Sequence, residues 1–145
     1  MLIDINVLLY LADANSPFHL LARRWLAAAA ADGARLGLPW HCILGFLRLS
    51  TNPRLNDSPL SVDSAWRVVD AWLAHPLVFV PQPTNRHAQV LQQLMRQHGI
   101  PGARVADAHL AALAVEHNLT MVSFDRDFGR FAEIQWLDPA SEAGA

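Results

Sequence analysis

Four aspartates stand where apolar runs of the chain meet a turn or the start of a helix. They are Asp4 in LIDINVLLYL, Asp107 in VADAHLAALA, and Asp125 with Asp127 in VSFDRDFGRF. Folding can bring such positions together from distant segments, and gathered carboxylates repel one another unless a cation joins them. Mg²⁺ suits such a cluster because it needs only one or two carboxylates besides waters and substrate phosphates. The residues therefore indicate a Mg²⁺ or Mn²⁺ site capable of hydrolysing a phosphodiester.

Single aspartates also have ordinary structural roles. Asp107 could cap the helix AHLAALAVEH, and Asp125 with Asp127 could form an Asx-turn. Asp4 is the strongest candidate, because a charge within a buried strand is costly unless it is paired or bound to a metal. Asn6, two residues further on, is expected to point the same way from that strand.

Alternating strands and helices are predicted to position these residues. The run 2–11 carries a single charge and predicts a central buried strand. Helices are predicted after Ser16 and Pro17, from about Trp40 to Ser50, after Ser61, after Thr84 and around Asp107, with Gly33 and Gly99 as stops. A short apolar piece covers 36–38, and strands are expected at 77–80, 119–124 and, as an edge strand, 134–137.

This alternation predicts an α/β fold with a mainly parallel sheet, because parallel neighbours need crossovers and helices must cover both faces. Sites in such sheets form beyond the carboxyl ends of the strands, where Asp4 and Asp125 are expected. The 145 residues, without a visible linker, predict one domain spanning 1–145.

Composition narrows the setting of the protein. The longest apolar stretches are about ten residues, short of the ~20 that cross a bilayer, and no basic region precedes the first one, so we expect a cytoplasmic protein without a membrane segment. A hydrophobic content of 52% and five tryptophans favour a homodimer that hides apolar surface. The net charge of −2 argues against binding nucleic acid by bulk electrostatics, which leaves local contacts by arginine.

Cysteine and histidine do not predict a zinc site. Cys42 is the only cysteine and lies in the apolar run WHCILGFL, which is typical of a core position. The histidines are scattered, and His109 and His117 lack a third ligand at useful spacing. His109 follows Asp107 closely and could be a general acid, an RNA contact or a packed side chain.

The order and spacing of these motifs resemble the PIN-domain nucleases, and among them the VapC toxins of type II toxin-antitoxin systems. IDINVLLY, DAHLAALA and FDRDF carry the resemblance, with WHCILGFLRLSTNPR and PLSVDSAWRVVDAWL between them. The resemblance implies a PIN-like three-layer α/β/α sandwich. It also implies a Mg²⁺- or Mn²⁺-dependent endoribonuclease that cleaves tRNA, rRNA or other RNA and is inhibited by a VapB-type antitoxin.

The resemblance assigns roles to individual residues. Asp4, Asp107 and Asp125 would be the catalytic metal-binding carboxylates, Asp127 a further ligand or nearby acid, and Asn6 and Ser123 their supports. One position departs from the family, since Gly45 stands where many PIN nucleases carry a glutamate. Either Asp127 or waters complete the shell, or metal affinity is lowered, or the chain is a weakened PIN domain that inhibits translation by binding RNA without cleavage. We favour the active enzyme, because the three other acids match.

Arginines supply candidate contacts around the acids. Arg48 lies one helical turn after Gly45 and could pair with a carboxylate, contact a phosphate or bind the antitoxin. Predicted loops and helix ends carry further candidates for RNA phosphates, namely Arg54, Arg104, Arg126 and Arg130. A phosphatase-like hydrolase is disfavoured, because the residue two positions after Asp4 is an asparagine rather than a second aspartate.

Overall fold

The computed structural model describes residues 1–141, in which a parallel sheet forms the centre of the molecule. The strand order is β3-β2-β1-β4-β5. The strands are β1 (Leu2–Ile3), β2 (Leu36–Gly37), β3 (Val78–Phe79), β4 (Met121–Val122) and β5 (Trp136–Leu137). Every neighbouring pair is parallel, as predicted. The strand at the N-terminus is therefore central, and the last strand is at an edge, as predicted.

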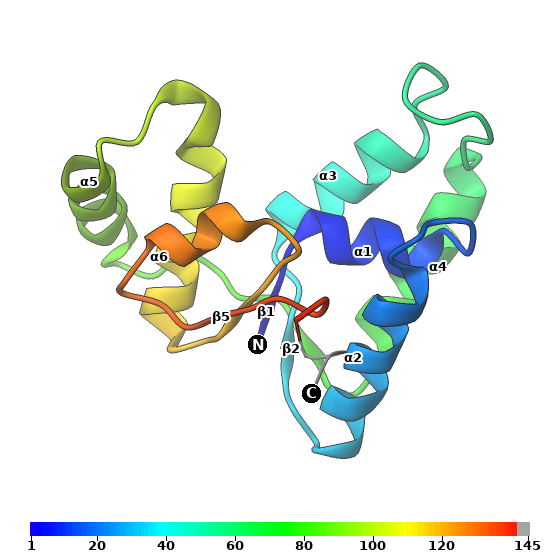
Figure 1. Cartoon of the computed structure of the whole chain (residues 1–145), viewed down its shortest axis with the longest axis horizontal. Coiled ribbons are helices and arrows are strands. Elements are labelled where there is room, and N and C mark those ends of the chain that lie inside the picture. Colours follow the sequence, from blue (N-terminus) through cyan, green and yellow to red (C-terminus); the bar gives the residue numbers. More distant parts are fainter. Residues whose placement is uncertain (142–145) are drawn as a thin grey trace.

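Helices fall into two groups beside the sheet. The helices are α1 (Ile5–Ala12), α2 (His19–Ala31), α3 (Trp40–Ser50), α4 (Val62–Ala74), α5 (His87–His98) and α6 (Val105–His117), with short 3-10 turns η1 (Gly102–Arg104) and η2 (Arg126–Arg130). Helix α1 packs on α2 and α3, α3 packs on α4, and α5 packs on α6. Figure 1 shows the strands between these two groups. The predicted three-layer α/β/α sandwich is confirmed.

The predicted strand 2–11 is wrong in length. The strand ends at Ile3, and Asp4 begins α1 as its N-cap, with extended φ and ψ of −79° and 161°. The Asp4 carboxylate accepts a hydrogen bond from the Ile5 backbone N–H at 2.7 Å. Aspartate is a strong N-cap, and a short apolar run such as VLL fits a buried helix as well as a strand.

Two helix starts were also placed too early. Helix α2 begins at His19 without a side-chain cap, and Ser16 Oγ instead accepts a hydrogen bond from Phe18 N at 3.2 Å within a turn. Helix α5 begins at His87, because the Thr84 hydroxyl is bonded to Glu116 across the molecule. In each case the hydroxyl side chain forms another contact.

The other strands lie within the predicted ranges but are shorter, with two residues each, whereas several helix boundaries agree with the prediction. Ser61 caps α4 by accepting a hydrogen bond from Ser64 N at 3.1 Å. Helix α3 spans the expected residues, and α5 stops at Gly99, whose φ of 57° is left-handed. Such a conformation suits glycine, which lacks the Cβ that would strain it.

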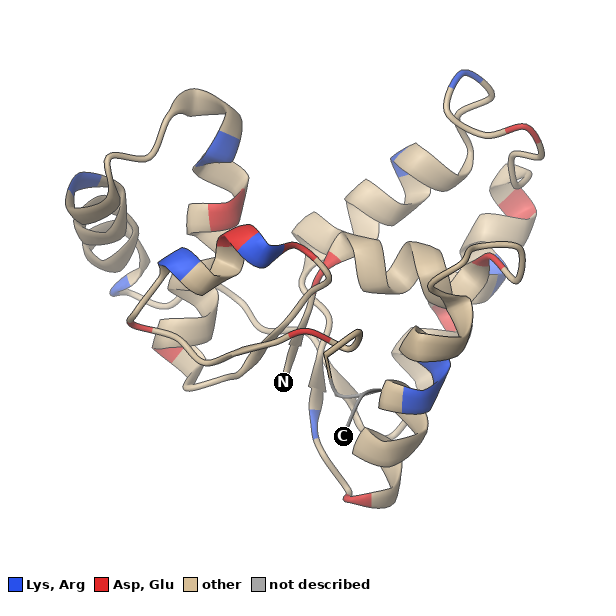
Figure 2. Ribbon diagram, in the orientation of Figure 1, with Lys and Arg blue, Asp and Glu red and all other residues tan. Residues whose placement is uncertain are grey.

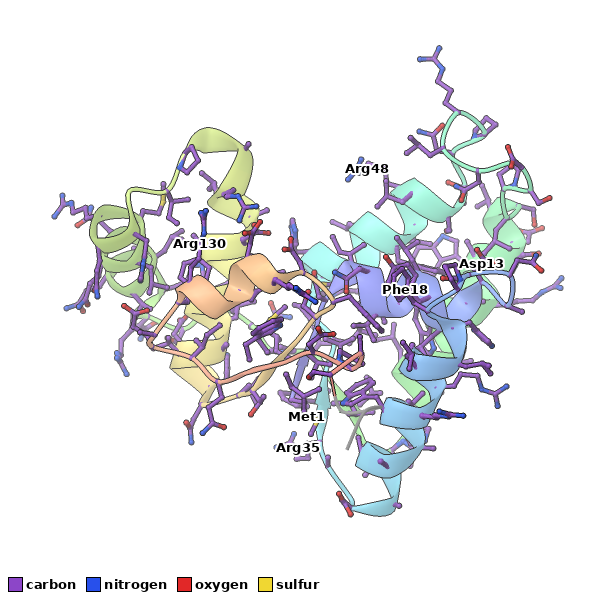
Figure 3. All side chains as sticks on the ribbon, in the orientation of Figure 1. Met1, Asp13, Phe18, Arg35, Arg48 and Arg130 are labelled. Carbon is purple, nitrogen blue, oxygen red and sulfur yellow. The ribbon has the colours of Figure 1, made fainter. Side chains whose placement is uncertain are left out.

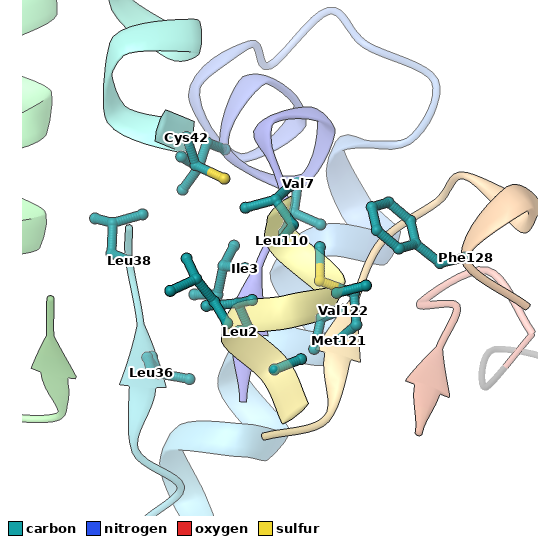
Figure 4. Close-up of a cluster of buried hydrophobic side chains, with 14 of the residues drawn as sticks. Leu2, Ile3, Val7, Leu36, Leu38, Cys42, Leu110, Met121, Val122 and Phe128 are labelled. Carbon is teal, nitrogen blue, oxygen red and sulfur yellow. The ribbon is translucent and has the colours of Figure 1, made fainter. Parts of the chain in front are cut away.

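The core lies between the sheet and the helices. Leu2, Ile3, Met121 and Val122 come from the strands, Val7 from α1 and Leu110 from α6, and all are buried (Figure 4). Cys42 is fully buried among them, which confirms its predicted packing role. Burial raises the pKa of the Cys42 thiol well above 9.0, and the Asp4 carboxylate adds to that effect. No helix within residues 1–141 is long and apolar enough to cross a bilayer.

Candidate metal-binding and catalytic site

Asp4 lies at the carboxyl end of the central strand and is only 8% exposed. Its Oδ1 accepts the Ile5 N–H that caps α1. Its Oδ2 accepts hydrogen bonds from Ser123 Oγ at 2.6 Å and from Asn6 Nδ2 at 3.1 Å. Three donors therefore hold the Asp4 carboxylate in one orientation at the carboxyl end of the central strand.

Asn6 and Ser123 connect Asp4 to the segment that follows β4. Ser123 is fully buried, and its Oγ accepts hydrogen bonds from Asn6 Nδ2 at 3.0 Å and from Asp125 N at 2.9 Å. Asn6 Oδ1 accepts one from Phe124 N at 3.3 Å. Asn6 faces Asp4 as expected, although it does so from the first turn of α1 rather than from a strand. The structure thus joins Asp4, Asn6, Ser123 and Asp125 in one hydrogen-bonded network.

Asp125 and Asp127 form the turn that starts η2. Asp125 Oδ1 accepts a hydrogen bond from Asp127 N at 2.9 Å, so the expected Asx-type turn is present. The Asp127 carboxylate pairs with the Arg104 guanidinium and lies 3.8 Å from Arg130 Nε. Figure 2 shows the charged residues of η2 beside those of η1 and α6.

Asp107 reaches the same region from the first turn of α6. Burial raises the pKa of Asp107, and the Asp125 carboxylate raises it further, against the opposing effects of Arg104 and His41. Burial also raises the pKa of Asp4, where Asp107 and Asp125 add to the shift and the hydrogen bonds from Ser123 and Ile5 oppose it. The three predicted carboxylates are therefore near enough to repel one another.

These carboxylates fit a hard divalent cation. Within residues 1–141, no three His, Cys, Asp or Glu side chains stand close enough together to enclose an ion by themselves. Mg²⁺ does not need such a cage, since waters and substrate phosphates usually supply most of its ligands. Burial is the main cause of the raised pKa values of Asp4 and Asp107, and neighbouring carboxylates add to it; a bound cation would offset both effects by favouring the ionised carboxylates.

Comparison with known proteins agrees with this geometry. The family model for the PIN domain matches residues 1–134. The chain belongs to the PIN-domain family. Ribonuclease VapC37 of Mycobacterium tuberculosis is 42% identical to this PIN domain over 95% of its length and 96% of the relative. Ribonuclease VapC43 of the same organism is 41% identical, covering 94% of this chain and 93% of the relative. These matches place the PIN domain among the VapC ribonucleases, as the resemblance implied.

Solved structures support the fold independently. VapBC2 from Rickettsia felis, bound to a DNA fragment from its promoter, superposes with a TM-score of 0.70 at 14% identity, over 94% of this chain and 96% of the other. VapC20 of Mycobacterium tuberculosis gives a TM-score of 0.68 at 17% identity, over 90% of this PIN domain and 94% of its own chain. At these identities the likeness shows the PIN fold alone.

Gly45 of this PIN domain lies in close contact with α1. A Cβ placed on Gly45 would be 2.4 Å from Ile5 Cδ1 and 2.9 Å from Ile5 Cγ1. The position where the resemblance leads us to expect a glutamate is thus occupied by the Ile5 side chain from α1. Arg48, one turn later, is exposed and extends away from α3 (Figure 3). Arg126 is likewise exposed, at the start of η2.

Two residues near the acids were not predicted in the roles that the structure gives them. Arg104 was considered only as a phosphate contact, yet it pairs with Asp127 and lies 3.8 Å from Asp107. Arg104 precedes Asp107 by three residues at the start of a helix, and this spacing could have predicted that the two side chains lie close together. His41, in the first turn of α3, lowers the pKa of the Asp107 carboxylate. No spacing in the sequence indicates that these two residues lie close together.

His109 packs among histidines from other segments. Its Nδ1 lies 2.9 Å from His87 Nε2, and its ring centroid is 5.7 Å from that of His41. Burial lowers the pKa of His109, and the nearby His87 and His41 lower it further. The Glu116 carboxylate opposes this lowering.

Proposed function

We propose that the chain is the toxin of a VapBC type II toxin-antitoxin module and acts as a Mg²⁺- or Mn²⁺-dependent endoribonuclease. The relatives named as VapC ribonucleases are 34–42% identical over nearly the whole chain. The observation that supports the metal dependence is that Asp4, Asp107 and Asp125 come from three separate segments, and that burial together with the Asp125 carboxylate raises the pKa values of the first two. The cytoplasm, where such RNA is found, is the proposed location.

Each residue of the network has a separate task in this reaction. A bound divalent cation would supply an activated water and neutralise charge on the scissile phosphate. Asp4, Asp107 and Asp125 would hold it, and Asp127 would add a ligand or stay paired with Arg104. Ser123 and Asn6 orient Oδ2 of Asp4 through their hydrogen bonds. Held in this way, the carboxylate needs little rearrangement when it binds the ion.

The test is RNA cleavage by the purified chain with Mg²⁺, with EDTA, and with Mg²⁺ restored after EDTA. We expect cleavage that EDTA stops and Mg²⁺ restores, and no cleavage by Asp107→Asn. The control is Asp32→Asn, at the exposed end of α2, which should cleave like the parent. Metal-independent cleavage, or an Asp107→Asn variant with parental activity, would contradict the proposal.

Gly45 favours a second candidate, a weakened PIN domain that inhibits translation by gripping RNA. The glutamate expected there is absent, and the contact with Ile5 leaves little room for it. Intact RNA together with metal-independent arrest of translation would support this candidate over the nuclease.

A VapB-type antitoxin is the proposed protein partner. The solved neighbours include VapBC2 from Rickettsia felis and a toxin-antitoxin complex from Klebsiella pneumoniae, the latter with a TM-score of 0.68. The exposed Arg48 and Arg126 and the half-buried His109 are the proposed contacts for RNA or antitoxin. A homodimer is proposed as well, because α3 exposes Trp40 and Leu44. Apolar side chains of this size in one patch are typical of an interface.

A further inference from the structure

Arg104 is a positive charge placed among the acids of the proposed metal site. It ends η1 directly before α6, and its side chain is 29% exposed. Its guanidinium pairs with the Asp127 carboxylate of η2, and its Nη1 lies 3.8 Å from Asp107 Oδ2 in the first turn of α6. One guanidinium therefore contacts two of the four aspartates, which come from separate elements (Figure 2).

The contact with Asp107 gives Arg104 an electrostatic role like that of a bound ion. Burial and the Asp125 carboxylate raise the pKa of Asp107, whereas Arg104 lowers it by favouring the ionised form. In the described part of the chain, 1–141, no three His, Cys, Asp or Glu side chains enclose a space for an ion. The charge of Asp107 is thus partly neutralised by a side chain of the protein itself.

A guanidinium and a divalent ion at the same carboxylate affect each other. Arginine keeps its proton in proteins, so Arg104 is positive whenever a cation arrives. Two positive charges repel, and the double charge of Mg²⁺ or Mn²⁺ doubles the repulsion. The pair with Asp127 keeps the guanidinium beside Asp107 and so maintains this repulsion.

We propose that Arg104 competes with the divalent cation for the Asp107 carboxylate and so lowers the metal affinity of the site, with Asp127 as the positioning residue that keeps the guanidinium there. The inference rests on the proposed metal-dependent function. Asp127 then binds the arginine rather than the ion. Exposed ion pairs contribute little to stability, so the effect is expected in metal binding rather than in the free energy of unfolding.

Mn²⁺ binding tests the competition without an activity assay. The metal-free protein is titrated with Mn²⁺ at low salt, and the electron paramagnetic resonance signal of free Mn²⁺ gives the Kd. Arg104→Gln should bind Mn²⁺ about 3–30-fold more tightly, the range for removing a unit charge about 5 Å from a divalent ion in water. Arg104→Lys keeps the charge and should stay closer to the parent. Unchanged or weaker binding by Arg104→Gln would overturn the proposal.

Arg130→Gln is the matched control. It removes the same charge, and Arg130 Nε lies 3.8 Å from the same Asp127 carboxylate. The Arg130 side chain is 60% exposed, however, and forms no ion pair with Asp107 within residues 1–141. Its Kd should change by less than about 2-fold, because solvent and salt screen exposed charges. A gain equal to that of Arg104→Gln would show that net charge, rather than the contact with Asp107, determines the affinity.

Asp127→Asn tests the positioning role. Without the Asp127 carboxylate the guanidinium can pair more fully with Asp107, so Mn²⁺ binding should weaken. Combined with Arg104→Gln, the same change should have a clearly smaller effect, because no guanidinium is left to reposition. A metal ligand would be missed equally in both proteins. Equal losses would therefore overturn the role given to Asp127.

The outcomes separate this inference from the proposed function. Thermal melts show whether each variant is folded, and Arg104→Met, also uncharged and of similar length, replaces Arg104→Gln if that variant is not. If the parent binds Mn²⁺ and cleaves RNA with Mg²⁺, but neither variant binds Mn²⁺ more tightly, the inference fails and the nuclease stands. If the parent binds no Mn²⁺ and cleaves no RNA, both fail together.

Discussion

Within residues 1–141 the Asp4 carboxylate accepts hydrogen bonds from three donors: the Ile5 N–H, the Asn6 amide and the Ser123 hydroxyl. An asparagine at this position has one acceptor oxygen and one NH₂ group. At least one of the three donors would then face the NH₂ group, which cannot accept its hydrogen bond. We expect Asp4→Asn to lower the free energy of unfolding by about 1–3 kcal/mol through the unsatisfied group. Cleavage should fall by more than the roughly 100-fold typical of losing an outer contact of a metal site.

Urea denaturation and an RNA cleavage assay with Mg²⁺ measure the two effects of Asp4→Asn. The matched control is Asp70→Asn, at an exposed position of α4, which should change neither. An Asp4→Asn variant that is folded and cleaves at the parental rate would contradict the assignment of Asp4.

The raised pKa of Asp107 predicts a pH-dependent cost to stability in the metal-free protein. A folded pKa above the ordinary value of 3.8 means that the folded state binds the proton more tightly than the unfolded chain does. The favourable contribution is complete below 3.8 and is lost as the pH rises through the folded pKa. Asp107→Asn in EDTA should therefore gain melting temperature relative to the parent as the pH rises from acidic to neutral.

Thermal melts of both proteins across that pH range measure the difference. Added Mg²⁺ should raise the melting temperature of the parent more than that of Asp107→Asn, since the ion binds the folded state. A difference between the two proteins that stays constant with pH in EDTA would show that the carboxylate is not under this electrostatic cost.

For the strands and helices that carry the acids, the order along the chain could be predicted more accurately than the first and last residues. Asp4 and Asp125 were correctly placed at strand ends, because apolar runs broken by single acids indicate where buried strands stop. The boundary between β1 and α1 was missed, since the run after Asp4 is equally apolar in a strand or a helix. A helix was predicted to start after Thr84, and the contact of Thr84 with Glu116 depends on a fold that local sequence does not encode. The same holds for the contacts of His87 with His109 and Glu116, which are 22 and 29 residues further along the chain.

The contact between α1 and α3 at Gly45 gives a prediction for this pair of helices. A methyl group at position 45 would meet Ile5 Cδ1 at 2.4 Å, so Gly45→Ala should cost about 1–3 kcal/mol of overpacking, partly offset by about 1 kcal/mol of helix propensity. Ile5→Val removes Cδ1 and should make the alanine less costly. Urea denaturation of the single and double variants should give a favourable coupling of at least about 0.5 kcal/mol.

Gly102→Ala is the control for this cycle, because a Cβ there meets nothing within 4 Å. It should show no coupling to Ile5→Val. Additive free energies for Gly45→Ala and Ile5→Val would mean that the two side chains do not compete for the same space.

At the scale of the molecule, the composition pointed to surplus apolar surface, and the structure shows where it is. Trp25 is 5% exposed, whereas Trp40 and Trp66 are 43% and 39% exposed on α3 and α4. These two helices pack on each other, so their exposed side chains come from adjoining elements. Such a distribution could not be predicted from the tryptophan count alone, because helix periodicity shows which residues share a face but not which face the sheet covers.

The proposed homodimer can be tested with two leucines of equal exposure. Leu44 lies one turn after Trp40 on α3, and Leu55 lies in the loop after α3; each is 59% exposed. A charge at an apolar interface is costly, whereas the same charge on a solvated loop is nearly neutral. Light scattering at micromolar concentration should therefore show a dimer for the parent and for Leu55→Asp, and a monomer for Leu44→Asp with unchanged circular dichroism. A monomeric parent would remove the dimer, and a dimeric Leu44→Asp would move the interface away from α3.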